Sequence, residues 1–226
     1  MSSIKDNLEV VWENIDKTLS LSGRKGEVTL VAVTKTVSHD RIIEAVKAGV
    51  KIIGENRVAE AREKFDLVKE NVVWHMIGHL QRNKVKNALQ IFDMIQSIDR
   101  IETAMEIEKR AEKPIDILIE INSSGEETKS GVKPDGLFAL VDQLKSLKKV
   151  KIRGLMTIGP FTSDEKRIRN AFTLTRQKFE ELSAAEKDED IKYLSMGMSL
   201  DYRIAIEEGS NMVRVGTAIF GECQYV

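Results

Sequence analysis

Short apolar runs alternate with segments of helical spacing along most of the sequence, and eight such runs occur. The runs predict strands over residues 28–35, 51–56, 72–78, 94–99, 115–122, 150–158, 193–197 and 212–217. The segments between them predict helices over residues 38–49, 57–70, 85–92, 101–111, 134–144, 165–182 and around 204–205. This strand-then-helix order is typical of a parallel sheet covered by helices.

The eight runs are continuous and lack the alternation of apolar and polar residues that marks a half-exposed antiparallel strand. They predict a closed (β/α)8 barrel of the TIM type, with residues 1–226 as a single domain. An open doubly wound sheet is the main alternative. The first predicted strand lacks the glycine-rich dinucleotide fingerprint that would favour such a sheet.

Residues 1–23 precede the first strand and predict an extra N-terminal helix packed on the barrel. Ser2 or Ser3 is available as its N-cap, and Gly23 stands just past its end. Its apolar stripe consists of Ile4, Leu8, Val11, Ile15 and Leu19. Further along the chain, Thr162 and Glu165 have the spacing of a capping box in front of a long helix.

The composition excludes some classes of partner. Lys and Arg number 35 against 36 Asp and Glu, so no net field would recruit nucleic acid or an anionic membrane. No apolar run reaches transmembrane length and no leader pattern opens the sequence, so we expect a cytoplasmic protein. The single cysteine, Cys223, cannot form a disulfide within the chain. His75 and His79 are four residues apart without a third ligand, so we expect no metal site.

Polar and small residues gather where the predicted strands end, which is the functional face of a (β/α)8 barrel. Lys35 is the most informative, because a lysine at the end of a buried strand needs either access to solvent or a chemical role. We expect these strand-end residues to converge on one mouth: Lys35, Glu55, Asn56, Arg57, His75, Gly78, Asn122, Met156, Thr157, Ser195, Gly197, Ser199, Arg214, Gly216 and Thr217.

The segments SMGMS, residues 195–199, and VRVGT, residues 213–217, have the composition of a phosphate site. Small residues let the backbone approach a ligand, and hydroxyl and amide groups donate hydrogen bonds to it. Either segment alone is better explained as a plain turn. Both together, after the seventh and eighth strands, favour phosphate binding.

A lysine at the mouth, a phosphate cradle across from it and an arginine between them are the parts of a pyridoxal phosphate (PLP) site. Lys35 would supply the amine that condenses with the aldehyde, and Arg214 would partner the pyridine nitrogen. Two simpler readings stay open. Lys35 could extend to water, and Arg214 could form a structural ion pair.

Six segments carry a resemblance that adds to this reading: AVTKT, GENRVAE, WHMIGHLQRNK, GLMTI, LSMGMSLDYRIAIEEGS and VRVGTAIFGE. In this order they resemble the pyridoxal phosphate homeostasis protein family, whose fold is similar to the barrel domain of alanine racemase. The resemblance runs from the first strand to the end of the eighth. It therefore covers nearly the whole chain beyond the opening helix.

The resemblance implies roles for eight residues. Lys35 would form the internal aldimine with PLP, Asn56 would lie near the ring hydroxyl, and Arg214 would face the pyridine nitrogen. The other five would hold the phosphate or line the pocket, namely Ser199, Gly216 and Thr217 for the phosphate, and Met156 and Met198 for the lining. Ala59 departs from the family, which often has a glutamine there, and the role of His75 stays open.

Two functions follow from these residues. The first is a protein that holds PLP and moderates its supply to other enzymes without catalytic turnover, so that no residue is catalytic. The alternative is a racemase-like enzyme acting on amino acids. A racemase needs a base on each face of the cofactor, and Lys35 is the evident one. The tyrosines have no obvious claim to be the second, namely Tyr193, Tyr202 and Tyr225.

A phosphate-sugar enzyme on the same barrel is a weaker third reading, because no paired acid and base is evident. For partners we expect PLP itself and PLP-dependent apo-enzymes, and we expect the protein to be a monomer. Lys129 and Lys133 follow the fifth strand, and we expect both to be solvated.

Overall fold

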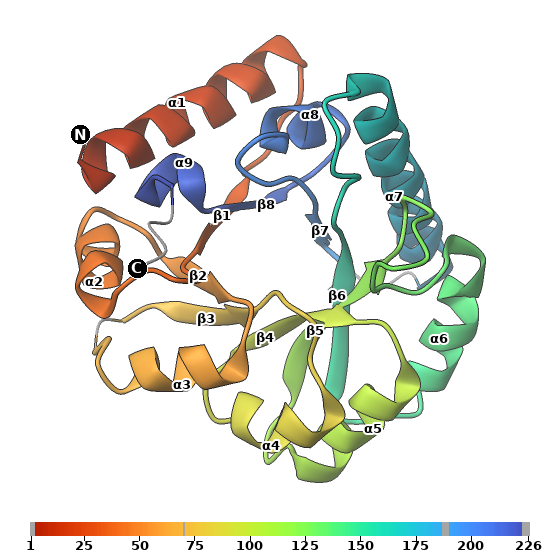
Figure 1. The fold of residues 1–226 in the computed structure, drawn as a ribbon. Coiled ribbons are helices and arrows are strands. Elements are labelled where there is room, and N and C mark those ends of the chain that lie inside the picture. The colour runs from red at the N-terminus through yellow and green to blue at the C-terminus, as the bar shows by residue number, and fades with distance from the viewer. Residues whose placement is uncertain (1–2, 70, 187–189, 223–226) are drawn as a thin grey trace.

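The computed structural model describes residues 3–69, 71–186 and 190–222, so Ser2, Cys223 and Tyr225 lie outside the described residues. Eight parallel strands follow one another around a closed barrel, and β8 pairs with β1 to complete it (Figure 1). The strands are β1 Thr29–Val33, β2 Ile52–Glu55, β3 Val73–Met76, β4 Met94–Ile98, β5 Ile115–Ile121, β6 Val150–Thr157, β7 Tyr193–Ser195 and β8 Met212–Val215. The predicted (β/α)8 barrel is confirmed.

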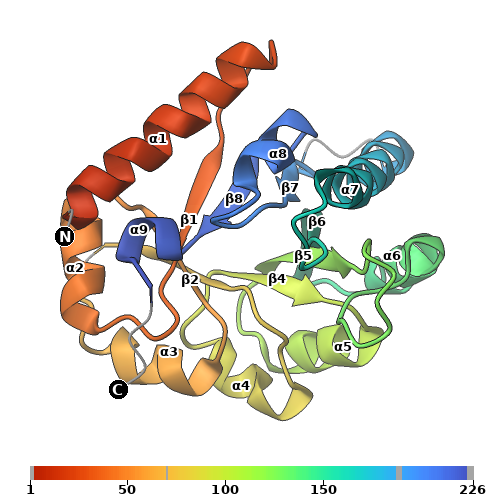
Figure 2. The same cartoon turned by 45° about the horizontal axis from the view of Figure 1, so that its top comes forward.

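Helices surround the barrel on its outside (Figures 1 and 2). The α-helices are α1 Ile4–Leu21, α2 His39–Lys47, α3 Val58–Phe65, α4 Val85–Ala88, α5 Ile101–Arg110, α6 Leu137–Leu144, α7 Glu165–Glu186, α8 Tyr202–Glu207 and α9 Thr217–Phe220. Two short 3-10 helices lie directly before α4 and α6, namely η1 Arg82–Lys84 and η2 Pro134–Gly136. Pro134 thus begins a 3-10 turn that leads into α6, where its missing N–H costs no hydrogen bond.

The extra N-terminal helix is confirmed as α1, which lies on the outside of the barrel and contacts α8 and α9 (Figure 2). Ser3 and Asp6 form a reciprocal capping box at its start. One face of α1 is buried, and Asn7 Nδ2 donates a hydrogen bond to the carbonyl of Ile219 at 2.9 Å. The helix is therefore tied directly to α9.

Apolar side chains form two separate clusters. The larger one fills the layer between the strands and the surrounding helices. The smaller one lies inside the barrel and consists of Val31, Ile77, Met94, Leu118, Met156 and Met212. Because strand residues alternate between two faces, residues two positions apart on a strand share this interior.

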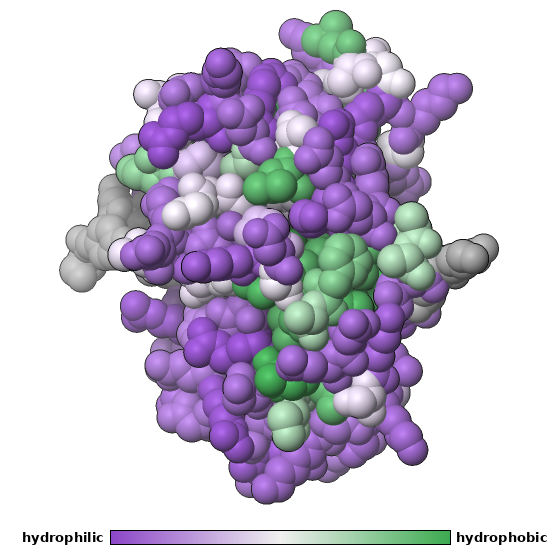
Figure 3. Space-filling view, turned by 90° about the vertical axis from the view of Figure 1, so that its right-hand side faces the viewer, coloured by the Kyte–Doolittle hydropathy of each residue, from purple (hydrophilic) through white to green (hydrophobic). Residues whose placement is uncertain are grey.

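One flank of the molecule has a mainly hydrophilic surface. Figure 3 shows the flank that carries α6 and α7, where a narrow strip of apolar side chains crosses an otherwise polar face. Among the described residues, no helix is long and apolar enough to cross a bilayer.

Three local predictions were wrong. The helix expected over residues 57–70 ends at Phe65, and the N–H of Leu67 bonds to the carbonyl of Lys64, three residues earlier. The helix expected over residues 85–92 ends at Ala88, because the N–H groups of Gln90 and Ile91 bond to carbonyls three residues earlier. Thr162 does not cap α7. Asp164 does so, because its carboxylate accepts from the N–H groups of residues 166 and 167, at 3.0 and 3.3 Å.

Candidate functional site

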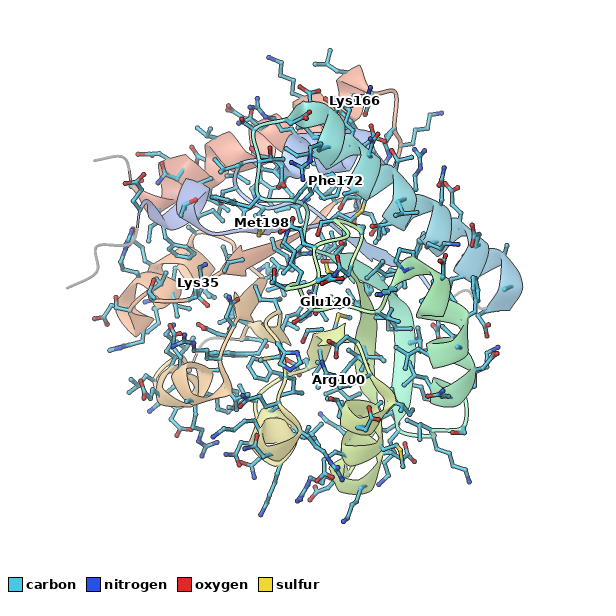
Figure 4. The ribbon with its side chains drawn as sticks, turned by 45° about the vertical axis from the view of Figure 1, so that its right-hand side comes forward. Lys35, Arg100, Glu120, Lys166, Phe172 and Met198 are labelled. Atoms are coloured by element: carbon cyan, nitrogen blue, oxygen red, sulfur yellow. The ribbon has the colours of Figure 1, made fainter. Side chains whose placement is uncertain are left out.

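The mouth at the carboxyl ends of the strands brings most of the predicted site residues together. Figure 4 places Glu120 near the middle of the barrel, with Lys35 and Met198 on surrounding loops. Of the eight predicted residues, Met156 and Arg214 are buried in strands, and Asn56, Ser199 and Gly216 are half-buried in the following loops. Lys35, Met198 and Thr217 are exposed.

Lys35 lies in the turn that follows β1 and is exposed to solvent. Val31 and Val33 contribute to the interior of the barrel. Lys35 follows Val33 by two residues, so it continues the inward-facing series of β1. The next residue, Thr36, has a φ of 61°, in the left-handed region that β-branched residues rarely adopt. The turn that presents the lysine is therefore strained.

The end of β2 meets the end of β3 at close range. A Cβ atom on Gly78 would lie 2.4 Å from the carbonyl oxygen of Asn56, so only glycine lets the two segments approach this closely. Asn56 lines a cavity of about 490 Å³ that His79 and Lys84 also border. Ala59 borders this cavity too, and its methyl group offers no hydrogen bond.

Backbone N–H groups form a small cradle at the start of α9. Ser199 Oγ accepts from the N–H groups of Gly216 and Ala218, at 3.1 and 3.3 Å. A Cβ atom on Gly216 would lie 3.2 Å from both the Cβ and the carbonyl oxygen of Val33, so this turn presses against β1. A phosphate group needs hydrogen-bond donors. This cradle contains two amides and one side-chain hydroxyl, with the exposed Thr217 beside them.

Arg214 is buried, with 3% of its surface exposed, and its guanidinium is held by uncharged acceptors. Nη1 donates to the carbonyl and hydroxyl oxygens of Ser195, and Nη2 donates to the carbonyl of Thr157, at 2.7 to 2.9 Å. In the described part of the chain no carboxylate lies within ion-pair distance, and Nε forms no hydrogen bond. Burial lowers the pKa of Arg214 to about 10, against the opposing charges of Glu120 and Asp201. The structural ion pair is therefore absent from these residues.

A chain of buried hydrogen bonds continues from Arg214 across the barrel. Ser195 Oγ donates to Gln96 Oε1 at 2.7 Å, and Gln96 Nε2 lies 2.8 Å from His75 Nδ1. Burial lowers the pKa of His75 to about 4, so the ring is neutral and Nδ1 accepts from the amide. His75 therefore orients Gln96, which in turn orients Ser195 and Arg214. Gln96 was not predicted, although a glutamine inside an apolar strand is a detectable signal.

Glu120 is the second residue that the sequence did not reveal as part of the site. It lies on β5, two residues after the inward-facing Leu118, and 4% of its surface is exposed. It borders a cavity of about 120 Å³ together with Asn122 and Lys129. Burial raises the pKa of Glu120 to about 7; the charge of Asp99 adds to this and that of Arg214 opposes it. The mouth thus contains a carboxyl group that titrates near neutral pH.

One strand-end residue does not face the mouth, and two residues of the loop after β5 form bonds other than those expected. Glu55 is fully buried and pairs with Lys64 of α3 at 2.8 Å, on the outer side of the barrel, so its predicted place was wrong. Asn122 binds the backbone of its own loop, where Nδ2 donates to the carbonyl of Glu126 at 2.8 Å. Lys129 is not simply solvated, because Nζ pairs with Glu126 at 2.9 Å and donates to the carbonyl of Gly159 at 3.0 Å.

Comparisons with known proteins agree on one family. A family model described as alanine racemase, N-terminal domain, matches residues 7–224. The pyridoxal phosphate homeostasis protein of Aquifex aeolicus is 42% identical and covers 97% of this chain and 98% of its own length. That of Vibrio cholerae is 38% identical and covers 100% of this chain and 98% of its own length.

Solved structures show the same relationship. PipY of Synechococcus elongatus, solved with PLP bound, is 32% identical with a TM-score of 0.80, covering 92% of this chain and all of PipY. Alanine racemase of Clostridium difficile is 18% identical with a TM-score of 0.73 and covers 96% of this chain but 57% of its own. This likeness shows that the chain and the racemase have the same barrel fold. From its full-length relatives and the match over residues 7–224, the chain belongs to the pyridoxal phosphate homeostasis protein family.

Proposed function

We propose that the protein binds PLP at the mouth of the barrel and serves the homeostasis of this cofactor. One observation carries the proposal: the turn of Lys35, the amide cradle of Ser199 and the buried Arg214 open onto the same end of the barrel. PipY, which is similar over its whole length, was solved with PLP bound. The relatives that match full-length are named for PLP homeostasis.

The phosphate end of the ligand fits the donors at the start of α9. The N–H groups of Gly216 and Ala218 donate to Ser199 Oγ, so an anion bound beside this hydroxyl would share the aligned amides with it. Thr217, the first residue of α9, offers an exposed hydroxyl beside them. We assign Ser199, Gly216 and Thr217 to the phosphate.

The ring end of the ligand fits the remaining residues. Arg214 Nε is the guanidinium atom left without a hydrogen bond among the described residues, and we assign it to the pyridine nitrogen. Asn56 is assigned to the ring hydroxyl. Fully buried Met156 supplies the floor, and Met198, which is 39% exposed, supplies the rim. When bound, PLP supplies an aldehyde that a lysine amine attacks, and we assign this amine to Lys35.

We also propose that the protein holds the cofactor without sustained turnover, since its relatives are named for homeostasis and not for a reaction. Glu120 supports the racemase-like alternative, for which the sequence offered no evident second base. A carboxyl group that titrates near neutral pH at the mouth is a candidate for the second base that such a reaction needs. Turnover that is lost in both Lys35→Ala and Glu120→Gln would establish the enzymatic alternative.

The test of binding is covalent attachment. Purified protein incubated with PLP should gain a visible absorption band, and borohydride should fix the cofactor mass to the peptide that contains Lys35. Lys84, which borders the cavity beside Asn56, provides a matched control as Lys84→Ala. The cofactor mass on another lysine, or on none, would refute the assignment.

Four further properties belong to the same proposal. We propose that residues 1–226 act as one domain, because α1 packs on α8 and α9. We propose a monomer in the cytoplasm that passes PLP to PLP-dependent apo-enzymes. Activation of an apo-enzyme by the loaded protein, measured against an equal amount of free PLP, tests the last point.

A further inference from the structure

Three charged side chains lie behind the turn of Lys35, between the barrel wall and α3. Lys64 Nζ lies 2.8 Å from Glu55 Oε1 and 2.7 Å from Glu60 Oε1. Glu55 is fully buried, whereas the side chains of Lys64 and Glu60 are 11% and 24% exposed. Buried ion pairs add little net stability, because desolvation opposes the attraction between the charges. Stability alone is therefore a weak explanation for this cluster.

The cluster binds the backbone on both sides of Lys35. Lys64 Nζ donates to the carbonyl of Thr34 at 2.7 Å, and Glu60 Oε1 accepts from the N–H of Thr36 at 2.5 Å. These two groups belong to the peptide units directly before and after the Lys35 Cα atom. Since a peptide unit is planar, fixing both units fixes φ and ψ of Lys35 and the direction of its Cα–Cβ bond.

The same contacts hold a conformation that the chain would not otherwise choose. Thr36 is the one non-glycine residue with a positive φ in the part of the chain that the structure describes. Its β-branched side chain makes this conformation costly, so surrounding contacts must maintain it. Thr34 Oγ1 adds a bond to Glu55 Oε1 at 2.7 Å, which ties the other side of the turn to β2.

The ionisation state of Glu60 suits it to hold the backbone next to Lys35. Burial raises the pKa of Glu60, but hydrogen bonds from Lys64 and from the N–H of Thr36 outweigh it and leave the pKa below its usual value. Glu60 is therefore ionised at neutral pH and is a strong acceptor for the N–H of Thr36. Burial raises the pKa of Glu55, and the charge of Lys64 opposes this rise.

We propose that Glu60 and Lys64 are positioning residues that aim the Lys35 side chain at the mouth for covalent attachment of PLP. This inference rests on the proposed function. In the attachment, the Lys35 ammonium first loses a proton to solvent, and its nitrogen then bonds to the aldehyde carbon. The bond between the aldehyde carbon and its oxygen breaks, and the oxygen leaves as water with the two hydrogens of the neutral amine, so no oxidant or reductant is required. Glu60 and Lys64 affect the step through the backbone of the turn.

The experiment compares Glu60→Ala with Glu63→Ala, an exposed glutamate on the same helix. One measurement is the PLP concentration needed for half-maximal borohydride trapping at Lys35. The other is the affinity for pyridoxine 5′-phosphate, which has the ring and phosphate but no aldehyde. For Glu60→Ala we expect trapping to require about tenfold more PLP, with analogue affinity within about twofold of wild type. Glu63→Ala should match wild type in both.

Two further variants extend the test. Lys64→Met removes the other backbone contact and should show the same split between trapping and analogue affinity. In a Thr36→Gly background, glycine adopts the positive φ without steric cost. Glu60→Ala should therefore impair trapping at Lys35 less in this background than in wild type. Equal trapping in Glu60→Ala and Glu63→Ala, or a parallel loss of analogue affinity, would overturn the positioning role. Absence of trapping at Lys35 in wild type would instead refute the proposed function.

Discussion

The pH dependence of stability provides a direct test of the buried carboxyl group at the mouth. The perturbation is Glu120→Gln, which keeps the shape of the side chain and removes its titration. In the folded protein the pKa of Glu120 lies at about 7, against 4.5 for an unperturbed glutamate. This difference corresponds to about 3 kcal/mol, at about 1.36 kcal/mol for each pKa unit.

The direction of the effect follows from proton linkage. Because the folded state binds the Glu120 proton more tightly than the unfolded state, its contribution is fully present below pH 4.5 and is lost as the pH rises through about 7. His75 acts in the opposite direction. Its pKa is lowered from 6.5 to about 4 by burial, so its contribution is present above pH 6.5 and is lost as the pH falls through about 4.

In the wild type these two effects offset each other over much of the range between pH 4.5 and 6.5. Glu120→Gln should therefore unmask the contribution of His75. Urea unfolding of both proteins at pH 5 and pH 8 measures the free energy of unfolding. We subtract the free energy of unfolding of the wild type from that of the variant at each pH. This difference should be more positive at pH 8 than at pH 5 by about 2 to 3 kcal/mol. An equal difference at both pH values would refute the burial of an ionisable Glu120.

Three other predictions concern single residues. Ser199→Ala removes one donor to the phosphate and should weaken PLP affinity by tens of fold, since a hydrogen bond to a charged group contributes roughly 1.5 to 3 kcal/mol; equal affinity in a spectroscopic titration would place the phosphate elsewhere. Gly154→Ala would put a Cβ atom 1.8 Å from the carbonyl oxygen of Tyr193, so thermal unfolding should show either a large loss of stability or no folded protein. Incubation with each L-amino acid should give no D-isomer or keto acid at rates of roughly 1 per second or more, and faster turnover abolished by Lys35→Ala would contradict the non-enzymatic proposal.

The barrel could be predicted because its signal is local and repeated. Each strand is a continuous apolar run, and the strand-then-helix order leaves few ways to arrange eight of them. Lys35 and Arg214 could be singled out for a similar reason, since a charged residue at a buried strand is rare enough to need an explanation. Errors arose where neighbouring hydrogen bonds decide the outcome, as at Asp164, which caps α7 in place of Thr162.

The support around these residues could not be predicted in the same way. Gln96 and Lys64 bond to groups on other elements, and Glu120 reaches the mouth from the inner face of β5, so their places depend on which face of a strand or helix they occupy. Lys64 reads as one of many charged residues on a helix, yet it lies against the carbonyl next to Lys35. A single sequence shows which residues are present, but only the folded structure shows which of them contact one another.

The hydrogen bond between Asn7 and Ile219 joins residues 212 positions apart, and the backbone donors proposed for the phosphate lie at the start of the same short helix, α9. Closing a loop of this length costs conformational entropy, which the pairing of β8 with β1 and the packing of α9 on α1 must offset. The proposed anion site is therefore complete only after the ring has closed. A ligand that occupies it binds only molecules that have completed this step, and its binding energy adds to the free energy that keeps the first and last segments together. In a cell, the concentration of PLP would then help to set how long each copy survives proteolysis.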